Sequence, residues 1–164
     1  MFIFHSFSEA DTLRLGHIFG SLLSTTKSMS GLTVLLFGPL GSGKTVFVRG
    51  VCEELGTSAR SPSFTLINEY HAKDNTLIIH ADLYRLAPGD MRDIGLGEQE
   101  DCVTFVEWPE RWTSLPRENT LTVRIEPVGE NERLFEIFSA GDAGDAGDAG
   151  DSGLMRLISD ALGA

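Results

Sequence analysis

Apolar and polar positions along the chain predict buried strands interleaved with amphipathic helices. The apolar, partly β-branched run Thr33–Phe37 is typical of a buried strand, and so is Val103–Glu107, which ends in a carboxylate. In Ser8–Leu23, apolar residues recur at helical spacing after a serine that is placed to cap the helix, and Thr45–Leu55 shows the same spacing. These segments predict an α/β fold with a central mixed β-sheet flanked by helices.

Shorter segments complete the expected sheet. Phe2–Phe7 predicts a first strand, and the turn residues Asp74-Asn75 and Gly129-Glu130-Asn131 each separate two segments that predict a hairpin. The paired segments are Phe64–Tyr70 with Thr76–Asp82, and Leu121–Pro127 with Arg133–Phe138. After the first hairpin, a loop marked by Pro88-Gly89 is expected to contain a short helix around Asp90–Ile94.

The end of the chain departs from this pattern. Residues 140–153 carry a Gly-Asp-Ala repeat without aromatic or branched side chains, which predicts a flexible acidic linker because it cannot build a packed core. Weak Ca²⁺ binding by its aspartates is the less favoured alternative. Residues 154–164 predict a short amphipathic helix whose apolar side comprises Leu154, Ile158, Ala161 and Leu162. Residues 1–139 are therefore expected to form one domain.

The loop between the strand Thr33–Phe37 and the helix after it carries the strongest chemical signal. Gly38–Thr45 matches the phosphate-binding P-loop pattern of Gly, four residues and Gly-Lys-Thr, in the strand-loop-helix context that confirms it. Its backbone N–H groups and the helix N-terminus favour a bound phosphate. Lys44 is placed to reach the β- and γ-phosphates, and the Thr45 hydroxyl to ligate Mg²⁺. The sequence therefore predicts a single P-loop NTPase-type domain.

A P-loop site also needs a carboxylate that holds Mg²⁺ or orients an attacking water, usually at the end of a neighbouring strand. Asp82 and Glu107 both end apolar segments. We favour Glu107 near the metal, because its strand is the cleaner apolar run and Trp108-Pro109 follows at once. Asp82 then either positions a water or metal-bound water, or only caps its loop. Of the four histidines, which show no ligand spacing, His80 alone is close to a candidate site.

Thr65 follows a proline-bounded loop about twenty residues after Lys44, where many P-loop NTPases carry a mobile segment that senses the γ-phosphate. It is therefore a candidate switch residue. The alternative is a threonine that serves only the β-propensity of the following strand.

Composition narrows the class of protein. The net charge of −11 disfavours tight direct binding to a nucleic-acid backbone, so a protein partner is expected. No apolar run approaches the ~20 residues of a membrane span, and Met1–Phe4 predicts a strand rather than a signal peptide, which indicates a cytoplasmic location. Cys52 and Cys102 stand singly and are expected to be packing residues rather than parts of a disulfide or zinc site.

Taken together, five segments resemble the bacterial TsaE (YjeE) family of ATPases, which act in the threonylcarbamoyladenosine modification of tRNA. They cover the chain nearly end to end in the family's order and comprise Asp11–Gly16, the P-loop running into Phe47–Gly50, Ser61–Tyr70, His80–Leu86 and Val106–Glu110. The P-loop is common to many enzymes, and the last three segments make the resemblance specific.

The resemblance implies a compact α/β P-loop fold, ATP rather than GTP, and a slow ATPase that drives or resets a complex of the TsaD and TsaB proteins. The chain is expected to be a monomer when isolated and to meet tRNA only through that complex. The resemblance implies catalytic roles for Lys44, Asp82, Glu107 and the switch residue Thr65, and it implies Thr45 and Glu107 as Mg²⁺ ligands. The nucleotide contacts it implies are Thr12, Gly38, Gly41, Ser42, Gly43, Lys44, Thr45, Val46, Trp108 and, as a weaker candidate, Arg133.

Two features depart from the family pattern. Pro39 stands where the family usually has an acidic residue, so any catalytic role of that acid is absent here. The Gly-Asp-Ala tract lengthens a normally short connection, which costs little because the entropy of loop closure grows slowly with length.

Three other functions compete with this one. A small-molecule kinase would need an arginine-rich lid, and a small GTPase would need an Asn-Lys-x-Asp motif; the chain has neither. A nucleotide-gated adaptor that binds ATP without hydrolysing it is not separated from a slow ATPase by the sequence.

Overall fold

The computed structural model describes residues 1–26, 31–62, 65–87, 96, 101–113, 115–116, 118–139, 156–158 and 160–161. The repeat at 140–153 and the helix expected around Asp90–Ile94 lie outside these residues. Within the described part of the chain, no helix is long and apolar enough to cross a bilayer.

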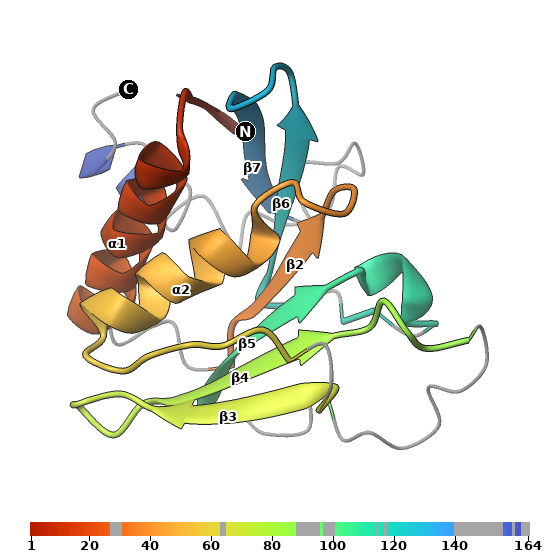
Figure 1. Cartoon of the computed structure of the whole chain (residues 1–164). Helices are drawn as coiled ribbons and strands as arrows, with labels where there is room; N and C mark the ends of the chain where they lie inside the picture. Colours follow the sequence, from red (N-terminus) through yellow and green to blue (C-terminus); the bar gives the residue numbers. More distant parts are fainter. Residues whose placement is uncertain are drawn as a thin grey trace.

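One seven-stranded mixed sheet forms the centre of the molecule, with the strand order β1-β7-β6-β2-β5-β4-β3 (Figure 1). The strands are β1 (Phe2–Ser6), β2 (Thr33–Phe37), β3 (Ile67–His71), β4 (Leu77–Asp82), β5 (Cys102–Glu107), β6 (Thr120–Pro127) and β7 (Arg133–Ser139). The four strands β6, β2, β5 and β4 run parallel, and β1, β3 and β7 pair antiparallel at the two sides. This arrangement confirms the predicted α/β class and mixed sheet.

Two helices, α1 (Glu9–Thr25) and α2 (Lys44–Glu54), pack against each other on one face of the sheet (Figure 1). Ser8 caps α1 as predicted, because its hydroxyl accepts a hydrogen bond of 3.1 Å from the Asp11 N–H. The main core lies between these helices and the sheet, and it contains Phe47, Phe105 and Phe135, all fully buried. A smaller apolar cluster forms around Leu35, Ala81, Leu83 and Val106.

The hairpin β3–β4 starts later than the sequence predicts. The expected strand began at Phe64, which lies outside the described residues, whereas β3 begins at Ile67. The N–H groups of Thr65 and Leu66 both donate to the Pro62 carbonyl, and Leu66 has a positive φ of 70°. This local turn takes the donors that an extended strand would need.

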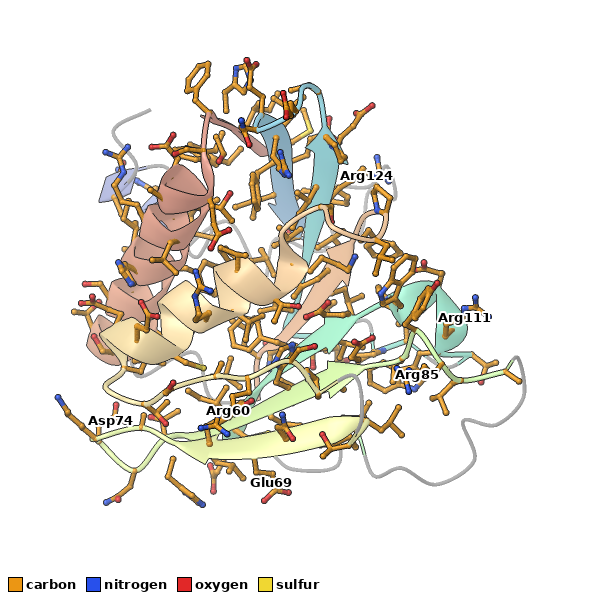
Figure 2. All side chains as sticks on the ribbon, in the orientation of Figure 1. Arg60, Glu69, Asp74, Arg85, Arg111 and Arg124 are labelled. Atoms are coloured by element: carbon orange, nitrogen blue, oxygen red, sulfur yellow. The ribbon has the colours of Figure 1, made fainter. Side chains whose placement is uncertain are left out.

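The turn of this hairpin falls where it was predicted. Asn75 has a φ of 66°, and the Thr76 N–H donates to Asp74 Oδ1 over 3.0 Å. The backbone hydrogen bond from Thr76 lowers the pKa of Asp74. Figure 2 shows Asp74 at the tip of the hairpin, and the labelled arginines Arg85, Arg111 and Arg124 around the outside of the sheet.

Part of the expected C-terminal helix is described. Residues 156–158 and 160–161 are helical. Ile158 is fully buried and belongs to the main core, so the chain returns to the domain at this point.

Two glycines allow α1 and α2 to approach closely. A Cβ on Gly16 would lie 2.3 Å from the Phe47 carbonyl oxygen, and a Cβ on Gly50 would lie 2.3 Å from that of Leu13. Backbone atoms cannot yield as a side chain can, so any larger residue must push the helices apart.

Replacing Gly16 by alanine is therefore expected to destabilise the fold by about 1 to 3 kcal/mol, the usual cost of overpacking. Chemical denaturation monitored by circular dichroism measures this, with Ser21→Ala, an exposed change on the same helix, as the matched control. Equal midpoints for the two variants would contradict the close helix contact.

Both thiols are expected to be unreactive in the folded protein. Cys52 and Cys102 are buried, and burial raises the pKa of the Cys52 thiol to about 12. At about pH 8, a disulfide reagent should modify neither thiol in the native state and both after unfolding, because only thiolates react. Rapid labelling of either residue in the native protein would show that it is accessible.

Candidate nucleotide-binding site

The site is built where β2 ends and α2 begins, in the middle of the parallel part of the sheet. The loop between them needs glycine at its two ends. Gly38 has a φ of 148°, and a Cβ there would meet the Ile125 carbonyl at 2.5 Å. Gly43 has a φ of 105° and caps α2, so the first N–H groups of the helix remain directed at the loop. The loop and helix start thus have the geometry of an anion site.

The Lys44 side chain lies inside this loop. Its Nζ donates to the carbonyls of Gly38 and Pro39 over 2.7 and 2.9 Å, and it lies 4.2 Å from the centroid of the Trp108 ring. Burial lowers the pKa of Lys44, while the carboxylates of Glu107 and Asp82 act in the opposite direction. The ammonium group is thus held beside the loop by two backbone carbonyls and by the face of Trp108.

Glu107 makes hydrogen-bond contacts with both Thr45 and His80. It ends β5, is only 3% exposed, and accepts a hydrogen bond of 2.7 Å from the Thr45 hydroxyl at the start of α2. The same oxygen, Oε1, lies 2.9 Å from His80 Nε2. Since β2 and β5 are parallel neighbours, the end of β5 lies directly beside the end of β2 and the loop that follows it.

Asp82 stands beside Glu107 on the next strand. The two residues are register partners across β4 and β5. Asp82 Oδ1 accepts a hydrogen bond of 3.0 Å from the Tyr84 N–H, so the residue caps its loop. Asp82 also lines the cavity described below. Its position is therefore compatible with both predicted roles, a loop cap and a group that positions a water.

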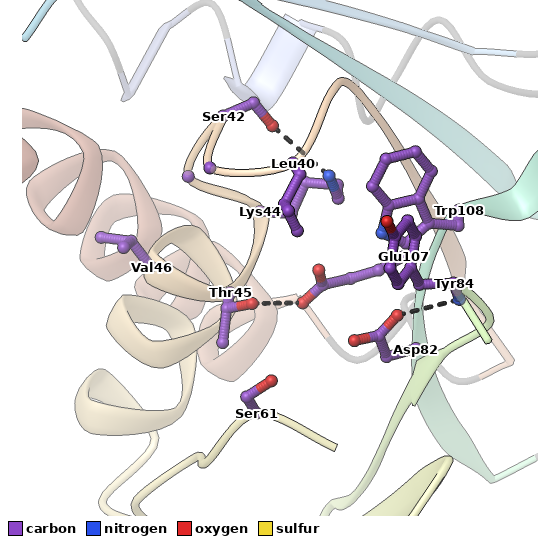
Figure 3. Close-up of a pocket in the computed structure, with 12 residues that line it drawn as sticks. Leu40, Ser42, Lys44, Thr45, Val46, Ser61, Asp82, Tyr84, Glu107 and Trp108 are labelled. Atoms are coloured by element: carbon purple, nitrogen blue, oxygen red, sulfur yellow. Dashed lines mark hydrogen bonds between the residues drawn. The ribbon is translucent and has the colours of Figure 1, made fainter. Parts of the chain in front are cut away.

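A cavity of about 290 Å³ lies between these groups (Figure 3). It is lined by Leu40, Gly41, Ser42, Gly43, Lys44, Thr45, Val46, Ser61, Asp82, Tyr84, Glu107 and Trp108. The close-up shows Thr45 and Glu107 meeting across the cavity, with the Trp108 ring near Lys44.

Trp108 covers one side of this cavity. Its backbone is left-handed, with a φ of 60°, which turns the chain sharply after Glu107. The indole ring then lies 4.8 Å from the ring of Tyr84, centroid to centroid. An aromatic wall beside a phosphate loop is suited to a nucleotide.

Comparisons with known proteins identify the family of this chain. The family model described as "Threonylcarbamoyl adenosine biosynthesis protein TsaE" matches residues 6–135. The tRNA threonylcarbamoyladenosine biosynthesis protein TsaE of Treponema pallidum is 37% identical over 134 residues, covering 77% of this chain and 92% of its own. The protein of the same name from Aquifex aeolicus is 35% identical over 135 residues, covering 80% and 91%. This chain belongs to the TsaE family.

A solved structure supports the same fold. The crystal structure of Bacillus subtilis YdiB superposes with a TM-score of 0.70 over 98% of this TsaE chain and 93% of its own, at 24% sequence identity. At that identity the likeness concerns the fold alone.

Three residues expected to contact the nucleotide, Thr12, Gly38 and Arg133, do not line the cavity of this TsaE protein, and neither does the expected switch residue Thr65. Thr12 is buried behind the loop and shares a hydrogen bond of 2.8 Å with the Ser6 hydroxyl. Thr65 is exposed and donates to Asn68 Oδ1 over 2.7 Å. Arg133 reaches the loop from outside, where its guanidinium donates to the Gly41 carbonyl over 3.5 Å. Their roles toward nucleotide stay predictions.

Leu40, Ser61, Tyr84 and His80 are residues that the predicted site did not include. Leu40 lies within the P-loop, Ser61 and Tyr84 lie in segments that carry the family resemblance, and His80 is marked in the sequence only by lying close to a candidate site. His80 is the clearest case: it is fully buried and contacts Glu107, yet it belongs to an apolar strand segment. A polar residue two positions before a candidate acid on a strand is the signal that could have found it.

The donor set suits Mg²⁺ bound together with phosphate rather than alone. Within the described residues, no group of three or more His, Cys, Asp or Glu side chains could hold a metal ion. Mg²⁺ in nucleotide sites usually takes one or two protein ligands, with phosphates and waters completing its shell. Because Thr45 gives its hydroxyl proton to Glu107, its oxygen lone pairs remain for a metal.

Trp108 should report nucleotide binding in this TsaE protein. Trp112→Phe leaves Trp108 as the one remaining tryptophan of two, and adding ATP with Mg²⁺ should change its fluorescence saturably, because the indole contacts Lys44 in the cavity. The reciprocal variant Trp108→Phe should show a much smaller change. An unchanged Trp112→Phe spectrum in the presence of a calorimetrically verified ligand would argue against this placement.

Proposed function

We propose that this protein is an ATP-binding, Mg²⁺-dependent ATPase that acts in tRNA threonylcarbamoyladenosine biosynthesis, in the cytoplasm, together with the TsaD and TsaB proteins. The observation that carries the proposal is the partly buried hydrogen bond between Thr45 of the P-loop and Glu107 at the end of β5. It joins the two oxygen groups that a P-loop ATPase uses for its metal. Membership of the TsaE family supports the pathway and the partners.

The phosphates are bound by the loop and the start of α2. The residues Gly41–Val46 line the cavity, so backbone N–H groups and the positive end of the helix dipole favour the negative phosphates. Lys44 supplies the side-chain cation, which already lies beside this loop.

Thr45 and Glu107 are the residues that would hold Mg²⁺. When bound, the ion would offset the negative charge that develops on the phosphates during phosphoryl transfer. Glu107 is buried, and the hydrogen bond between the two side chains holds both in place, so little reorganisation is needed on binding.

Asp82 is assigned the role of orienting the attacking water. Its carboxylate lines the cavity beside Glu107 and is kept in place by the Tyr84 N–H. Thr65 is assigned the switch role, and Thr12 and Arg133 auxiliary nucleotide contacts. Thr12 lies behind the loop and Arg133 lies outside it. A small movement of the loop would change the distance of either residue to a ligand.

The chain is proposed to be monomeric in isolation and to approach tRNA only within the partner complex. Its charge of −11 opposes direct binding to RNA phosphates.

Hydrolysis should depend on the partners and on the site. ATP turnover by the purified chain is expected to be slow, and to rise when TsaD, TsaB and tRNA are added. Asp82→Asn should keep ATP affinity but lose roughly 10²-fold or more in stimulated turnover, the usual contribution of a group that positions or deprotonates a nucleophile. Lys44→Ala should lose both ATP affinity and stimulated turnover, because it removes the cation that is proposed to bind the phosphates.

Glu126→Gln is the matched control, since it removes an exposed carboxylate on β6. ATP binding with no turnover under any condition would replace the ATPase by a nucleotide-gated adaptor. Transfer of the γ-phosphate to a small molecule would replace it by a kinase.

A further inference from the structure

His80 lies directly beneath the candidate metal site without lining the cavity. Its side chain is completely buried on β4, and its Nε2 is 2.9 Å from Glu107 Oε1. The proposed function gives this residue no role.

The sheet geometry explains how the contact arises. His80 and Asp82 are two positions apart on β4 and share a face. Asp82 is the register partner of Glu107. His80 is the register partner of Phe105, two residues earlier on each strand and further from the cavity. His80 therefore reaches Glu107 diagonally, from the side of the main core.

The contact defines which nitrogen carries the proton. An ionised carboxylate can only accept hydrogen bonds, so His80 Nε2 must donate. Among the described residues, the buried Nδ1 has no hydrogen-bond partner. The tautomer with hydrogen on Nε2 leaves only a lone pair at Nδ1, whereas the other would bury an unpaired N–H and direct a lone pair at the carboxylate.

Two donors therefore converge on one oxygen. Thr45 donates to Glu107 Oε1 from the P-loop side and His80 donates to it from the core side, over 2.7 and 2.9 Å. Neither bond uses Oε2. Two bonds from different directions restrict the rotation of the carboxylate, which a single bond would leave freer.

We propose that His80 is a positioning residue that fixes the Glu107 carboxylate for Mg²⁺-nucleotide binding. This inference rests on the proposed role of Glu107 at the metal. Partners that orient metal-binding groups from outside are typically worth about 10- to 100-fold in metal affinity. The competing explanation is that His80 only fills core volume.

The first measurement is made on the wild-type protein, and a variant serves only to assign the signals. Long-range ¹H–¹⁵N spectra of the nucleotide-free protein, labelled with ¹⁵N-histidine, should show hydrogen on His80 Nε2 and none on Nδ1. The His80 signals are assigned by their absence from the spectrum of His80→Gln. Hydrogen on Nδ1 instead would overturn the proposal.

The second measurement is the affinity for a non-hydrolysable ATP analogue, by calorimetry, with Mg²⁺ and with a chelator. His80→Leu keeps similar bulk but removes the donor, and should weaken binding about tenfold with Mg²⁺ while leaving the chelator value unchanged. His80→Gln, whose amide nitrogen reaches about as far as Nε2, should restore most of the loss. Ile78→Val, a core change two residues earlier on the same strand, is the control and should leave both affinities unchanged.

Each outcome is decisive. Equal Mg²⁺-dependent affinity in wild type and His80→Leu overturns the positioning role. A failure of His80→Gln to restore binding also overturns it, provided that the two variants unfold at the same thermal midpoint and so are equally stable. If wild type itself shows no Mg²⁺-dependent binding, the proposed function fails instead, and the NMR result still reports separately on the hydrogen bond.

Discussion

The hydrogen bond between Thr45 and Glu107 is the contact on which the site depends. It joins the first turn of α2 to the end of β5, two places that are 62 residues apart in the chain. A carboxylate that is 3% exposed has little water to solvate it, so it needs donors from the protein. Thr45 and His80 supply them. The position of the helix, the loop and the strand end is therefore coupled through one buried oxygen.

The buried charges of the site balance one another only in part. Burial lowers the pKa of Lys44, and Glu107 and Asp82 oppose that shift. The ammonium group is held by two loop carbonyls and by the face of Trp108. These are neutral partners, and they are exchanged more readily than a direct ion pair would be. Lys44 is thus held close to the loop by hydrogen bonds and by the Trp108 ring.

The helices support this arrangement from behind. Gly16 and Gly50 let α1 and α2 pack backbone against backbone, which fixes the start of α2 relative to the sheet. Thr12 of α1 is buried, and its methyl group would lie 3.5 Å from a Cβ on Gly43, the residue that caps α2. Displacing α1 would therefore disturb the phosphate loop, although α1 contributes no residue to the cavity.

The sequence alone was sufficient for most features that depend on local pattern, although the local turn before β3 was missed. The P-loop was predicted from its spacing, the strand Thr33–Phe37 from its apolar run, the Ser8 cap from the polar residue before a helical stripe, and the β3–β4 turn from Asp74-Asn75. Family membership followed from segments in the right order. The fold class and the family were confirmed. The roles of the site residues stay predictions, although Asp82, Glu107 and Trp108 do meet the P-loop at one cavity.

Tertiary structure decided which residues meet. The strand order places β5 beside β2 and β4 beside β5, and only this order brings Glu107 to Thr45 and His80 to Glu107. Thr12, Gly38, Thr65 and Arg133 do not line the cavity, although their positions along the chain could not distinguish them from residues that do. The physical reason is that local patterns report periodicity and turn chemistry, while a buried polar contact depends on strand neighbours that no short stretch of sequence specifies.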